Sequence, residues 1–375
     1  MRAIVLTCNT GQGHNSAGRA IRLELNSHDV ECETADALSF LGERVSGVIA
    51  GTFVNIAVKT PNIFGLMYQA GEKLSKELPE KIKSPVYRAN TLYAENLYRY
   101  LEENQIDAAI CPHLFPAEAL TYIKRKKKLK TKCYFISTDY TCIPFLEETD
   151  MDVVFIPHRD LRREFITRGV PGECIVDTGV PVLNKFSGAT PKNIARSMLG
   201  IPQNIPAFLV MTGGEGCGNA QDLTEEILNR IEEDTRVVVM PGRNTQLKNE
   251  LLFRFGDDKR VMVIGFTDSV ELYMDACDVL LTKPGGISST EAAVKGIPMI
   301  HTSPIPGCET INARFFSERG MSILAPDEES AAESAIRLSK DGSQKRRMLE
   351  AQAQYINKAA AEDICKRIIQ DATNI

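Results

Sequence analysis

Short polar or glycine-rich stretches, each following a run of apolar residues, carry the residues that could do chemistry. One holds Gly11-Gln12-Gly13-His14 and another holds Thr138-Asp139-Tyr140. A histidine in the turn after a strand is a candidate general base, and a carboxylate near it can orient it or contact a hydroxyl group. We therefore expect His14 and Asp139 to be catalytic. The alternative for each is a structural role in capping or packing its turn.

Two further stretches are rich in glycine: Thr212-Gly213-Gly214-Glu215-Gly216 and Lys283-Pro284-Gly285-Gly286. A glycine-rich turn before a helix presents backbone N–H groups to a phosphate. The first stretch lacks the lysine and hydroxyl residue of a P-loop, so kinase or ATPase chemistry is not indicated. Glu291 is expected in the first turn of the next helix, where its carboxylate can accept both ribose hydroxyls. A capping box from Ser288 to Glu291 is the alternative.

Gly11 and Gly13 also allow a second class of protein, a dinucleotide-binding module. Asp36, at the end of the next predicted strand, stands where a ribose-binding acid would lie. The fingerprint requires a third glycine at the position of Ser16. We therefore keep this class only as the weaker alternative.

The elements that must position these residues are short apolar runs separated by helical patterns, which predict parallel α/β sheets. Two series of such runs predict two doubly wound domains. The expected strands are Ala3–Cys8, Val30–Ala35, Ala108–Cys111, Cys133–Ser137, Val153–Ile156, Cys174–Asp177, Ala207–Met211, Val237–Met240, Val261–Ile264, Val279–Leu281, Met299–His301 and Ser322–Leu324. Loops at the carboxyl ends of such strands bind ligands, and the glycine-rich stretches fall there.

The stretch Gly179–Pro206 is punctuated by proline and glycine and predicts the domain boundary. We expect an N-terminal domain over 1–185 and a C-terminal domain over 186–355. A terminal helix over 356–375 is expected to cross back to the first domain.

Composition narrows the class of protein. The chain has 375 residues and a net charge of −5, so nothing in its overall charge points to a nucleic-acid partner. Its 10 cysteines show no C-x-x-C pair and no metal-type spacing against histidine, so no metal site is predicted. The N-terminus lacks the pattern of a signal peptide, and no run approaches the ~20 apolar residues of a membrane span. These features favour a cytoplasmic protein with reduced thiols.

At these motifs the chain resembles the glycosyltransferases that include monogalactosyldiacylglycerol synthase and the bacterial processive diacylglycerol glucosyltransferases. More remotely, it is similar to the peptidoglycan N-acetylglucosaminyltransferase. The resemblance implies a GT-B fold, in which two Rossmann-like domains face a central cleft. It also implies an inverting transfer of a hexose from a UDP-sugar, with no essential metal or other cofactor.

The resemblance further implies that the C-terminal domain binds the donor, with pyrophosphate near the glycine pairs, uracil near Phe266-Thr267 and sugar hydroxyls near Glu309 and Asn312. The implied donor-binding residues are Gly213, Gly214, Arg243, Phe266, Thr267, Lys283, Gly285, Gly286, Glu291, Glu309 and Asn312. The acceptor is expected on the N-terminal domain, near Gly11, Gly13, His14 and Tyr140. Some positions depart from the family pattern: Leu183 follows the Gly-x-Pro-Val turn where arginine is common, and Cys308 replaces the usual glutamine.

The segment Arg44–Leu78 carries large apolar residues, among them Phe53, Phe64 and Leu66. They fit an interfacial membrane helix and equally an ordinary buried helix. The basic run Lys124–Lys130 fits either an attraction to anionic headgroups or a solvated helix C-terminus. We expect a peripheral enzyme on the inner face of the cell membrane, acting on diacylglycerol or a glycosyl-diacylglycerol. A polyprenyl-linked or soluble acceptor is the alternative.

Overall fold

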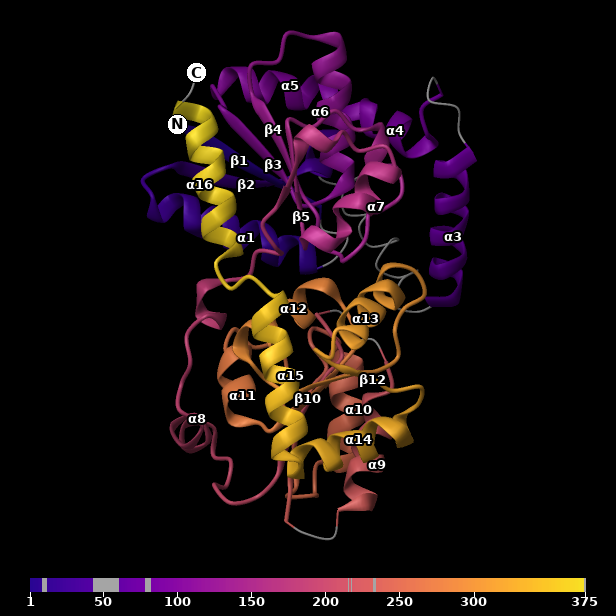
Figure 1. Ribbon diagram of the computed structural model, residues 1–375, viewed down its shortest axis with the longest axis vertical. Helices are drawn as coiled ribbons and strands as arrows, with labels where there is room; N and C mark the ends of the chain where they lie inside the picture. The colour runs from indigo at the N-terminus through magenta and orange to yellow at the C-terminus, as the bar shows by residue number, and fades with distance from the viewer. Residues whose placement is uncertain are drawn as a thin grey trace. The chain divides into compact units, whose positions relative to one another are not determined.

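A computed structural model of the chain describes residues 1–8, 12–42, 61–77, 82–214, 216, 218–231 and 234–373. They form two compact units (Figure 1). The N-terminal unit comprises Met1–Leu183, Pro306–Cys308 and Ala359–Ile375, and the C-terminal unit comprises Asn184–Ile305 and Glu309–Lys358. Each unit is an α/β sandwich around a parallel sheet, which confirms the predicted fold class.

The sheet of the N-terminal unit has the order β2-β1-β3-β4-β5-β6, and its strand pairs are parallel. Its strands are β1 (Arg2–Thr7), β2 (Glu31–Asp36), β3 (Ala108–Cys111), β4 (Lys132–Ile136), β5 (Val153–Ile156) and β6 (Ile175–Asp177). After β1 the chain forms β2 on one side of β1 and then returns to form β3 on the other side of β1. The strand order therefore reverses between β1 and β3. Ligands of such sheets bind outside the carboxyl ends of the strands at this reversal point.

Helices cover both faces of this sheet. They are α1 (Gln12–Ser27), α3 (Pro61–Glu77), α4 (Pro85–Asn90), α5 (Ala94–Glu103), α6 (Leu114–Lys126), α7 (Arg162–Thr167) and α16 (Ala360–Thr373). The terminal helix α16 packs beside α1 and buries Ile364, Cys365 and Ile368 against the strands (Figure 1). The last helix of the chain is therefore part of the core of the first unit.

The sheet of the C-terminal unit has the order β12-β11-β10-β7-β8-β9, also with parallel pairs. Its strands are β7 (Ala207–Met211), β8 (Arg236–Met240), β9 (Val261–Val263), β10 (Val279–Thr282), β11 (Met299–His301) and β12 (Ile323–Leu324). Its helices are α8 (Lys192–Leu199), α9 (Ala220–Arg230), α10 (Thr245–Phe255), α11 (Val270–Ala276), α12 (Gly286–Lys295), α13 (Cys308–Glu318), α14 (Glu328–Lys340) and α15 (Gly342–Tyr355). Here the order reverses between β7 and β10.

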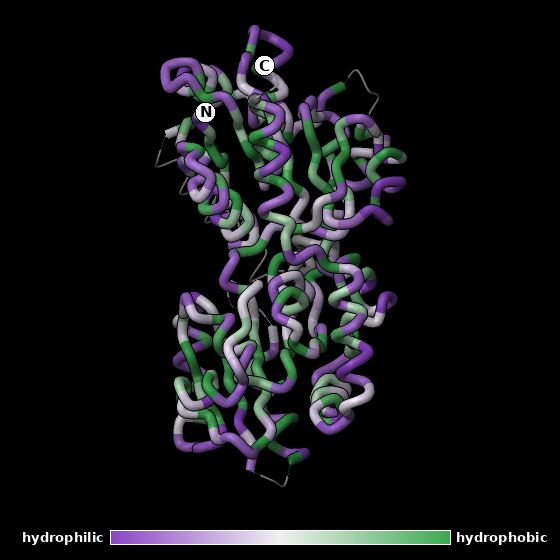
Figure 2. Tube along the Cα trace, turned by 60° about the vertical axis from the view of Figure 1, so that its left-hand side comes forward, coloured by the Kyte–Doolittle hydropathy of each residue, from purple (hydrophilic) through white to green (hydrophobic). Residues whose placement is uncertain are grey.

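The predicted strands agree with the observed ones to within one residue at either end. The central strands are predictable because they are buried on both faces, so the sequence shows continuous apolar runs; Figure 2 shows hydrophobic residues in green inside each unit. The edge strands β2, β6, β9 and β12 are only partly buried. Among the described residues, no helix combines the length and the apolar character needed to span a bilayer.

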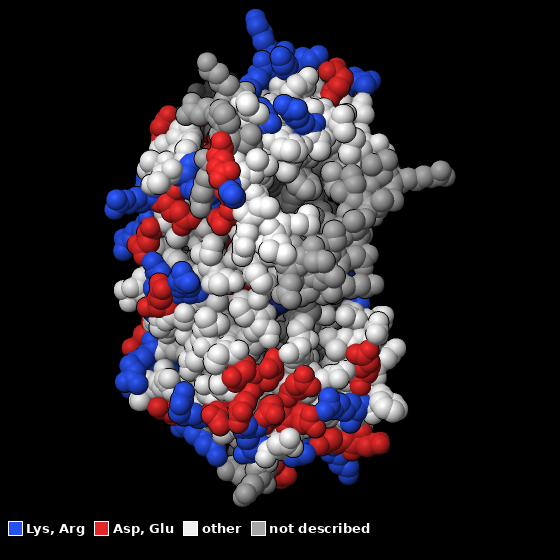
Figure 3. Space-filling model, turned by 90° about the vertical axis from the view of Figure 1, so that its right-hand side faces the viewer, with Lys and Arg blue, Asp and Glu red and all other residues white. Residues whose placement is uncertain are grey.

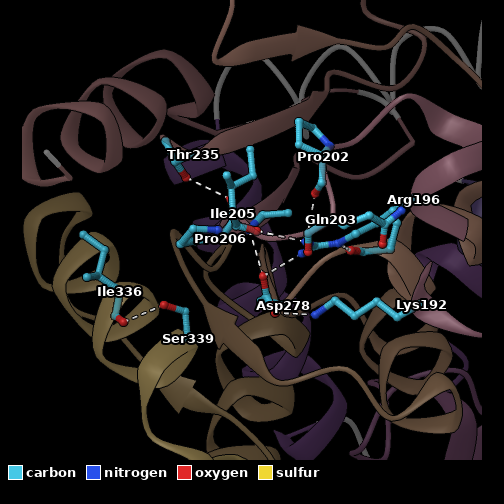
Figure 4. Close-up of polar contacts among 12 residues, drawn as sticks. Lys192, Arg196, Pro202, Gln203, Ile205, Pro206, Thr235, Asp278, Ile336 and Ser339 are labelled. Atoms are coloured by element: carbon cyan, nitrogen blue, oxygen red, sulfur yellow. Dashed lines mark hydrogen bonds and ion pairs between the residues drawn. The ribbon is translucent and has the colours of Figure 1, made fainter. Parts of the chain in front are cut away.

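A buried arginine fixes the chain that enters β7 (Figure 4). Arg196 of α8 is 3% exposed, and its guanidinium donates to Asp278 at 3.0 Å. It also donates to the backbone carbonyls of Pro202, Gln203, Ile205 and Ala276. Asp278 in turn accepts from the backbone N–H of Ala207 at 2.8 Å. Because a buried charge is costly unless it is paired and hydrogen-bonded, this cluster ties the amino ends of β7 and β10 together.

Candidate active site

In the N-terminal unit, residues that follow three neighbouring strands converge at the reversal point. His14 lies in the first turn of α1, after β1, and His113 follows β3; their rings are perpendicular, with centroids 4.8 Å apart. Nδ1 of His14 lies 3.0 Å from the hydroxyl oxygen of Thr138, which follows β4. The sequence predicts His14 at this point but indicates no role for Thr138 or His113.

The two histidines differ in what their nitrogens do. Nδ1 of His113 accepts from the backbone N–H of Phe115 at 3.2 Å, so this histidine caps α6. Burial, and next the neighbouring His14, hold the pKa of His113 well below its usual value. Burial also lowers the pKa of His14, although Asp139 and a hydrogen bond with the Pro112 backbone oppose that shift. His14 is therefore neutral at pH 7, the state that a general base requires.

The other residues that we predicted for the site of this unit differ in their burial and contacts. Asp139 is partly exposed and interacts electrostatically with His14, which is consistent with an orienting role. Tyr140 is only 1% exposed and packs in the core, so its ring offers no face to an acceptor in this conformation. Gly13 lies in the first turn of α1, and Gly11 is outside the described residues. Asp36, the residue of the dinucleotide alternative, accepts from the N–H of Leu38 in a tight turn.

In the C-terminal unit, the two glycine-rich stretches meet at the reversal point between β7 and β10. Gly213 has a φ of +76°, and a Cβ added there would lie 2.7 Å from Cε of Lys283. The positive φ favours glycine, and a Cβ here would displace the end of the Lys283 side chain. Behind it, the N–H of Arg243 donates to the carbonyl of Gly214 at 2.9 Å. A small hollow in this unit is lined by Thr212, Asn219, Lys283 and Ser303, among others.

Arg243, Phe266 and Thr267, which follow β8 and β9, extend this site. The guanidinium carbon of Arg243 lies 4.7 Å from the ring centroid of Phe266, a cation–π distance. The Phe266 side chain is 56% exposed, so an aromatic surface is available beside the glycine-rich turns. Thr267 accepts from the N–H of Ser269 at 3.1 Å and so shapes the turn into α11.

Helix α12 begins at Gly286, and its N-cap residue Gly285 makes no side-chain cap hydrogen bond. The first N–H groups of this helix therefore lack a capping side chain, which suits an anionic ligand. The capping-box alternative is wrong, because Ser288 lies inside the helix rather than at its N-cap. We expected Glu291 in the first turn of this helix. Because the helix begins at Gly286, Glu291 lies in the second turn.

The positive charge beside this helix already has a partner. Nζ of Lys283 lies 2.7 Å from Oε1 of Glu309, and the other carboxylate oxygen accepts from the N–H of Ile305 at 2.9 Å. Asn312 is fully buried, and its amide donates to the carbonyl of Pro284 at 3.1 Å. In this conformation Asn312 braces the Lys283–Gly286 turn, and a contact with a sugar stays a prediction for both Glu309 and Asn312.

Glu291 has an unusual protonation state. Desolvation of the partly exposed Glu291 side chain raises its pKa to about 8, against the attraction of Lys185 and with a smaller contribution from repulsion by Glu271. Lys185 is itself paired with Glu271 at 2.8 Å. Glu291 therefore carries a proton at pH 7 in the free protein. Among the described residues, no cluster of three or more His, Cys, Asp or Glu side chains could hold a metal ion.

Comparisons with known proteins bear on both units. Residues 14–182 match the family model of monogalactosyldiacylglycerol (MGDG) synthase, and residues 208–368 match that of the glycosyltransferase family 28 C-terminal domain. A processive diacylglycerol beta-glucosyltransferase of Bacillus cereus (strain AH187) is 23% identical over 373 residues, covering 99% of this chain and 94% of the relative. The enzyme of the same name from Staphylococcus carnosus is 27% identical over 256 residues, covering 68% of this chain and 65% of the relative.

Solved structures share the fold. The structure of Acinetobacter baumannii MurG has a TM-score of 0.60 at 12% identity, covering 98% of this chain and 99% of that one. The complex of Staphylococcus aureus MnaA with UDP has a TM-score of 0.66 at 14% identity, covering 100% and 97%. With two parallel six-stranded sheets, the fold is of the GT-B class, and the chain has the two domains of a glycosyltransferase. It belongs to the glycosyltransferases that join a monogalactosyldiacylglycerol synthase domain to a family 28 C-terminal domain.

Proposed function

We propose that the protein is an inverting hexosyltransferase that moves a hexose from a UDP-sugar to a membrane lipid, diacylglycerol or a glycosyl-diacylglycerol. The carrying observation is the meeting of Gly213, Lys283 and the uncapped start of α12 at one reversal point. Relatives named processive diacylglycerol beta-glucosyltransferase support the lipid acceptor and the glucosyl group. Structures of the same fold that are titled as complexes with UDP or UDP-glucose support the donor.

The donor pyrophosphate would bind the N–H groups at the start of α12 and the ammonium group of Lys283. Its negative charge competes with Glu309 for Lys283, so donor binding would release Glu309 to accept sugar hydroxyls. Uracil would lie on the exposed ring of Phe266, and Glu291 would accept from the ribose. Helix N-termini and Lys283 would stabilise the leaving UDP by fixed electrostatics, so we propose no metal in this step.

The transfer would be a single displacement. The acceptor hydroxyl loses its proton to the neutral imidazole of His14 while its oxygen attacks the anomeric carbon of the donor. The bond from that carbon to the β-phosphate oxygen breaks, UDP leaves with the electron pair, and the configuration at the carbon inverts. Asp139 would stabilise the imidazolium that forms, as its electrostatic interaction with His14 suggests.

Helix α3 supports the membrane part of the proposal, because its apolar side chains point outward. Leu66 is 65% and Met67 54% exposed. The opposite side contacts the protein: Glu72 pairs with Arg168 at 2.8 Å, Ser75 donates to Glu147, and Gly71 lies against the ring of Phe145. An ordinary buried helix would show the reverse pattern, whereas a helix that lies on lipid turns its apolar face away from the protein.

The other residues that we predicted to contact the membrane give less support to this proposal. Phe53 and the side chain of Phe64 lie outside the described residues. In the basic run, Lys124 pairs with Asp152 at 3.0 Å and Lys127 with Glu95 at 3.2 Å, which neutralises part of the attraction to anionic lipid. Figure 3 shows acidic side chains gathered on one face of the C-terminal unit. We propose that α3 provides the contact with the inner face of the cell membrane.

A thermal-shift comparison tests the class of ligand. UDP and UDP-hexoses should raise the melting temperature of the protein, because a ligand that binds only the folded state stabilises it. NADH should not, since Ser16 replaces the third glycine of a dinucleotide fingerprint. Stabilisation by NADH without any effect of UDP would contradict the proposal and favour the dinucleotide-binding alternative.

A further inference from the structure

A buried imidazole stands behind α12. His301, the last residue of β11, is 0% exposed, and its Nε2 lies 2.9 Å from the hydroxyl of Ser289 on α12. Its Nδ1 lies 3.1 Å from the hydroxyl of Ser322, which precedes β12. Ser289 and Ser322 are also buried, at 0% and 5% exposure, and the ring of Phe316 packs edge-on against the imidazole. The three polar side chains form a relay that links β11 to α12.

This histidine is not a candidate base. Burial lowers its pKa to about 3, so the ring stays neutral at any pH at which the protein would be assayed. A neutral imidazole has one donor and one acceptor nitrogen, and a serine hydroxyl can play either part. Both ring nitrogens of His301 therefore have a hydrogen-bond partner, whichever of them carries the proton. Removal of any member would leave a buried polar group without its partner, which is costly.

The hydrogen bond between His301 and Ser289 holds α12 close to the proposed contacts with the donor. Ser289 stands between Gly286, where the pyrophosphate would bind, and Glu291, where the ribose would bind. With a rise of about 1.5 Å per residue, both contacts lie within about 5 Å of Ser289 along the helix axis. Most of the rest of the inward face of α12 is apolar, with Ile287, Ala292 and Ala293 buried, but it also buries Thr290, which donates to the carbonyl of Gly286 within the helix. Apolar packing is not directional, so the axial position of the helix depends on its polar contacts. These include the hydrogen bond at Ser289, close to the proposed donor contacts, and the ion pair of Lys295 with Asp275 at 2.7 Å at the other end of the helix.

We propose that His301 is a positioning residue for donor binding, because its bond to Ser289 fixes α12 so that the phosphate and ribose contacts are in register. This inference rests on the proposed UDP-sugar donor. It assigns to the nucleotide site a residue that does not touch the nucleotide.

Two substitutions of His301 distinguish the effect of its hydrogen bond to Ser289 from that of its hydrogen bond to Ser322. In His301→Gln the side-chain amide reaches the place of Nε2 and keeps the bond to Ser289. In His301→Asn the shorter amide reaches the place of Nδ1 and keeps the bond to Ser322 instead. Both remove the ring from the same core position, so their losses of stability should be similar. The dissociation constant of UDP, measured by calorimetry, should rise on the order of tenfold in His301→Asn and much less in His301→Gln.

Substitutions of Ser289 and Ser322 form a matched pair of variants that leave the His301 ring in place. Ser289→Ala should weaken UDP binding as much as His301→Asn does, and the double variant should be no weaker, because both break one bond. Ser322→Ala, the control, breaks the bond that does not reach α12 and should have a smaller effect. Circular dichroism and melting curves establish that each variant is folded.

Two results would overturn the inference. One is a folded Ser289→Ala protein that binds UDP as tightly as the wild type. The other is an equal loss of UDP affinity in His301→Gln and His301→Asn that follows their melting temperatures, as a merely structural histidine would give. Failure of the wild type itself to bind UDP would instead contradict the proposed donor on which the inference depends.

Discussion

We expect the protonation of Glu291 to make UDP binding depend on pH. As the proposed ribose contact, its carboxylate accepts from two hydroxyls and must be ionised. Desolvation raises the pKa of this group to about 8 in the free protein in spite of the nearby Lys185, so the protonated form is favoured at pH 7. UDP binding must then expel the proton, and the affinity for UDP should increase as the pH rises.

The size of the effect follows from that pKa of about 8. At pH 7 the ionised form is about one-tenth of the population, which costs about 1.4 kcal/mol, or about tenfold in affinity. The dissociation constant of UDP should therefore fall about tenfold between pH 7 and pH 9, with nearly all of the change below pH 8.5. Above that pH the curve should flatten, because the carboxyl group is already ionised.

The same shift affects folding in the opposite direction. The folded pKa lies above the ordinary value of 4.5, so the folded state binds more protons than the unfolded state between about pH 4.5 and pH 8. The contribution of Glu291 to the free energy of unfolding is thus fully present below pH 4.5 and is lost as the pH rises to 8. Glu291→Gln cannot ionise, so its stability relative to the wild type should increase over that range.

Calorimetry with UDP between pH 6.5 and pH 9.5, at constant ionic strength, measures the effect. Glu291→Gln is the control, because it keeps the size of the side chain and removes the titration. Any change in charge of the UDP phosphate, whose pKa is about 6, appears in both proteins and cancels. Parallel pH profiles for wild type and Glu291→Gln would refute the reasoning, since they would show that Glu291 does not ionise on binding.

Three further results are expected. His14→Ala should lower turnover by about 10²-fold or more with UDP affinity unchanged, because the acceptor loses its base; a near-native rate would reduce His14 to a structural role. Gly213→Ala puts a Cβ at 2.7 Å from Cε of Lys283 at a φ of +76°. It should cost about 1–3 kcal/mol in chemical unfolding and weaken UDP binding, and wild-type behaviour would contradict the close packing of the two turns. Leu66→Ser should weaken flotation with anionic vesicles about tenfold, whereas Leu252→Ser on α10, 44% exposed, should not; equal effects would exclude α3 as the lipid contact.

The sequence predicts the fold well because burial on both faces leaves a strong apolar pattern in the central strands of each sheet. It predicts the start of α12 less well. The Ser288–Glu291 spacing suggests a capping box, but the helix begins earlier, at Gly286. Its N-cap residue is Gly285, which has no side chain to bond the first N–H groups. Spacing alone does not reveal whether a helix start is capped by its own side chains or left open for a ligand.

For the site, the sequence places His14 and the glycine-rich stretches correctly at the carboxyl ends of strands, since chain order and the parallel sheet fix those ends. It does not reveal the relay through His301, because its partners stand 12 and 21 residues away on other elements. It also misses the burial of Asn312, whose amide holds the backbone at Pro284. Such contacts depend on how elements pack laterally, and a single sequence does not show that.

The most direct test of the proposed function is hexose transfer itself. The wild type is incubated with a panel of UDP-hexoses and vesicles that contain diacylglycerol, polyprenyl phosphate or no lipid acceptor, and the products are identified by mass spectrometry. We expect a hexosyl-diacylglycerol with inverted anomeric configuration, formed from UDP-hexose by the wild type and about 10²-fold more slowly by His14→Ala. A hexosylated polyprenyl phosphate or soluble product, with diacylglycerol left unchanged, would contradict the account.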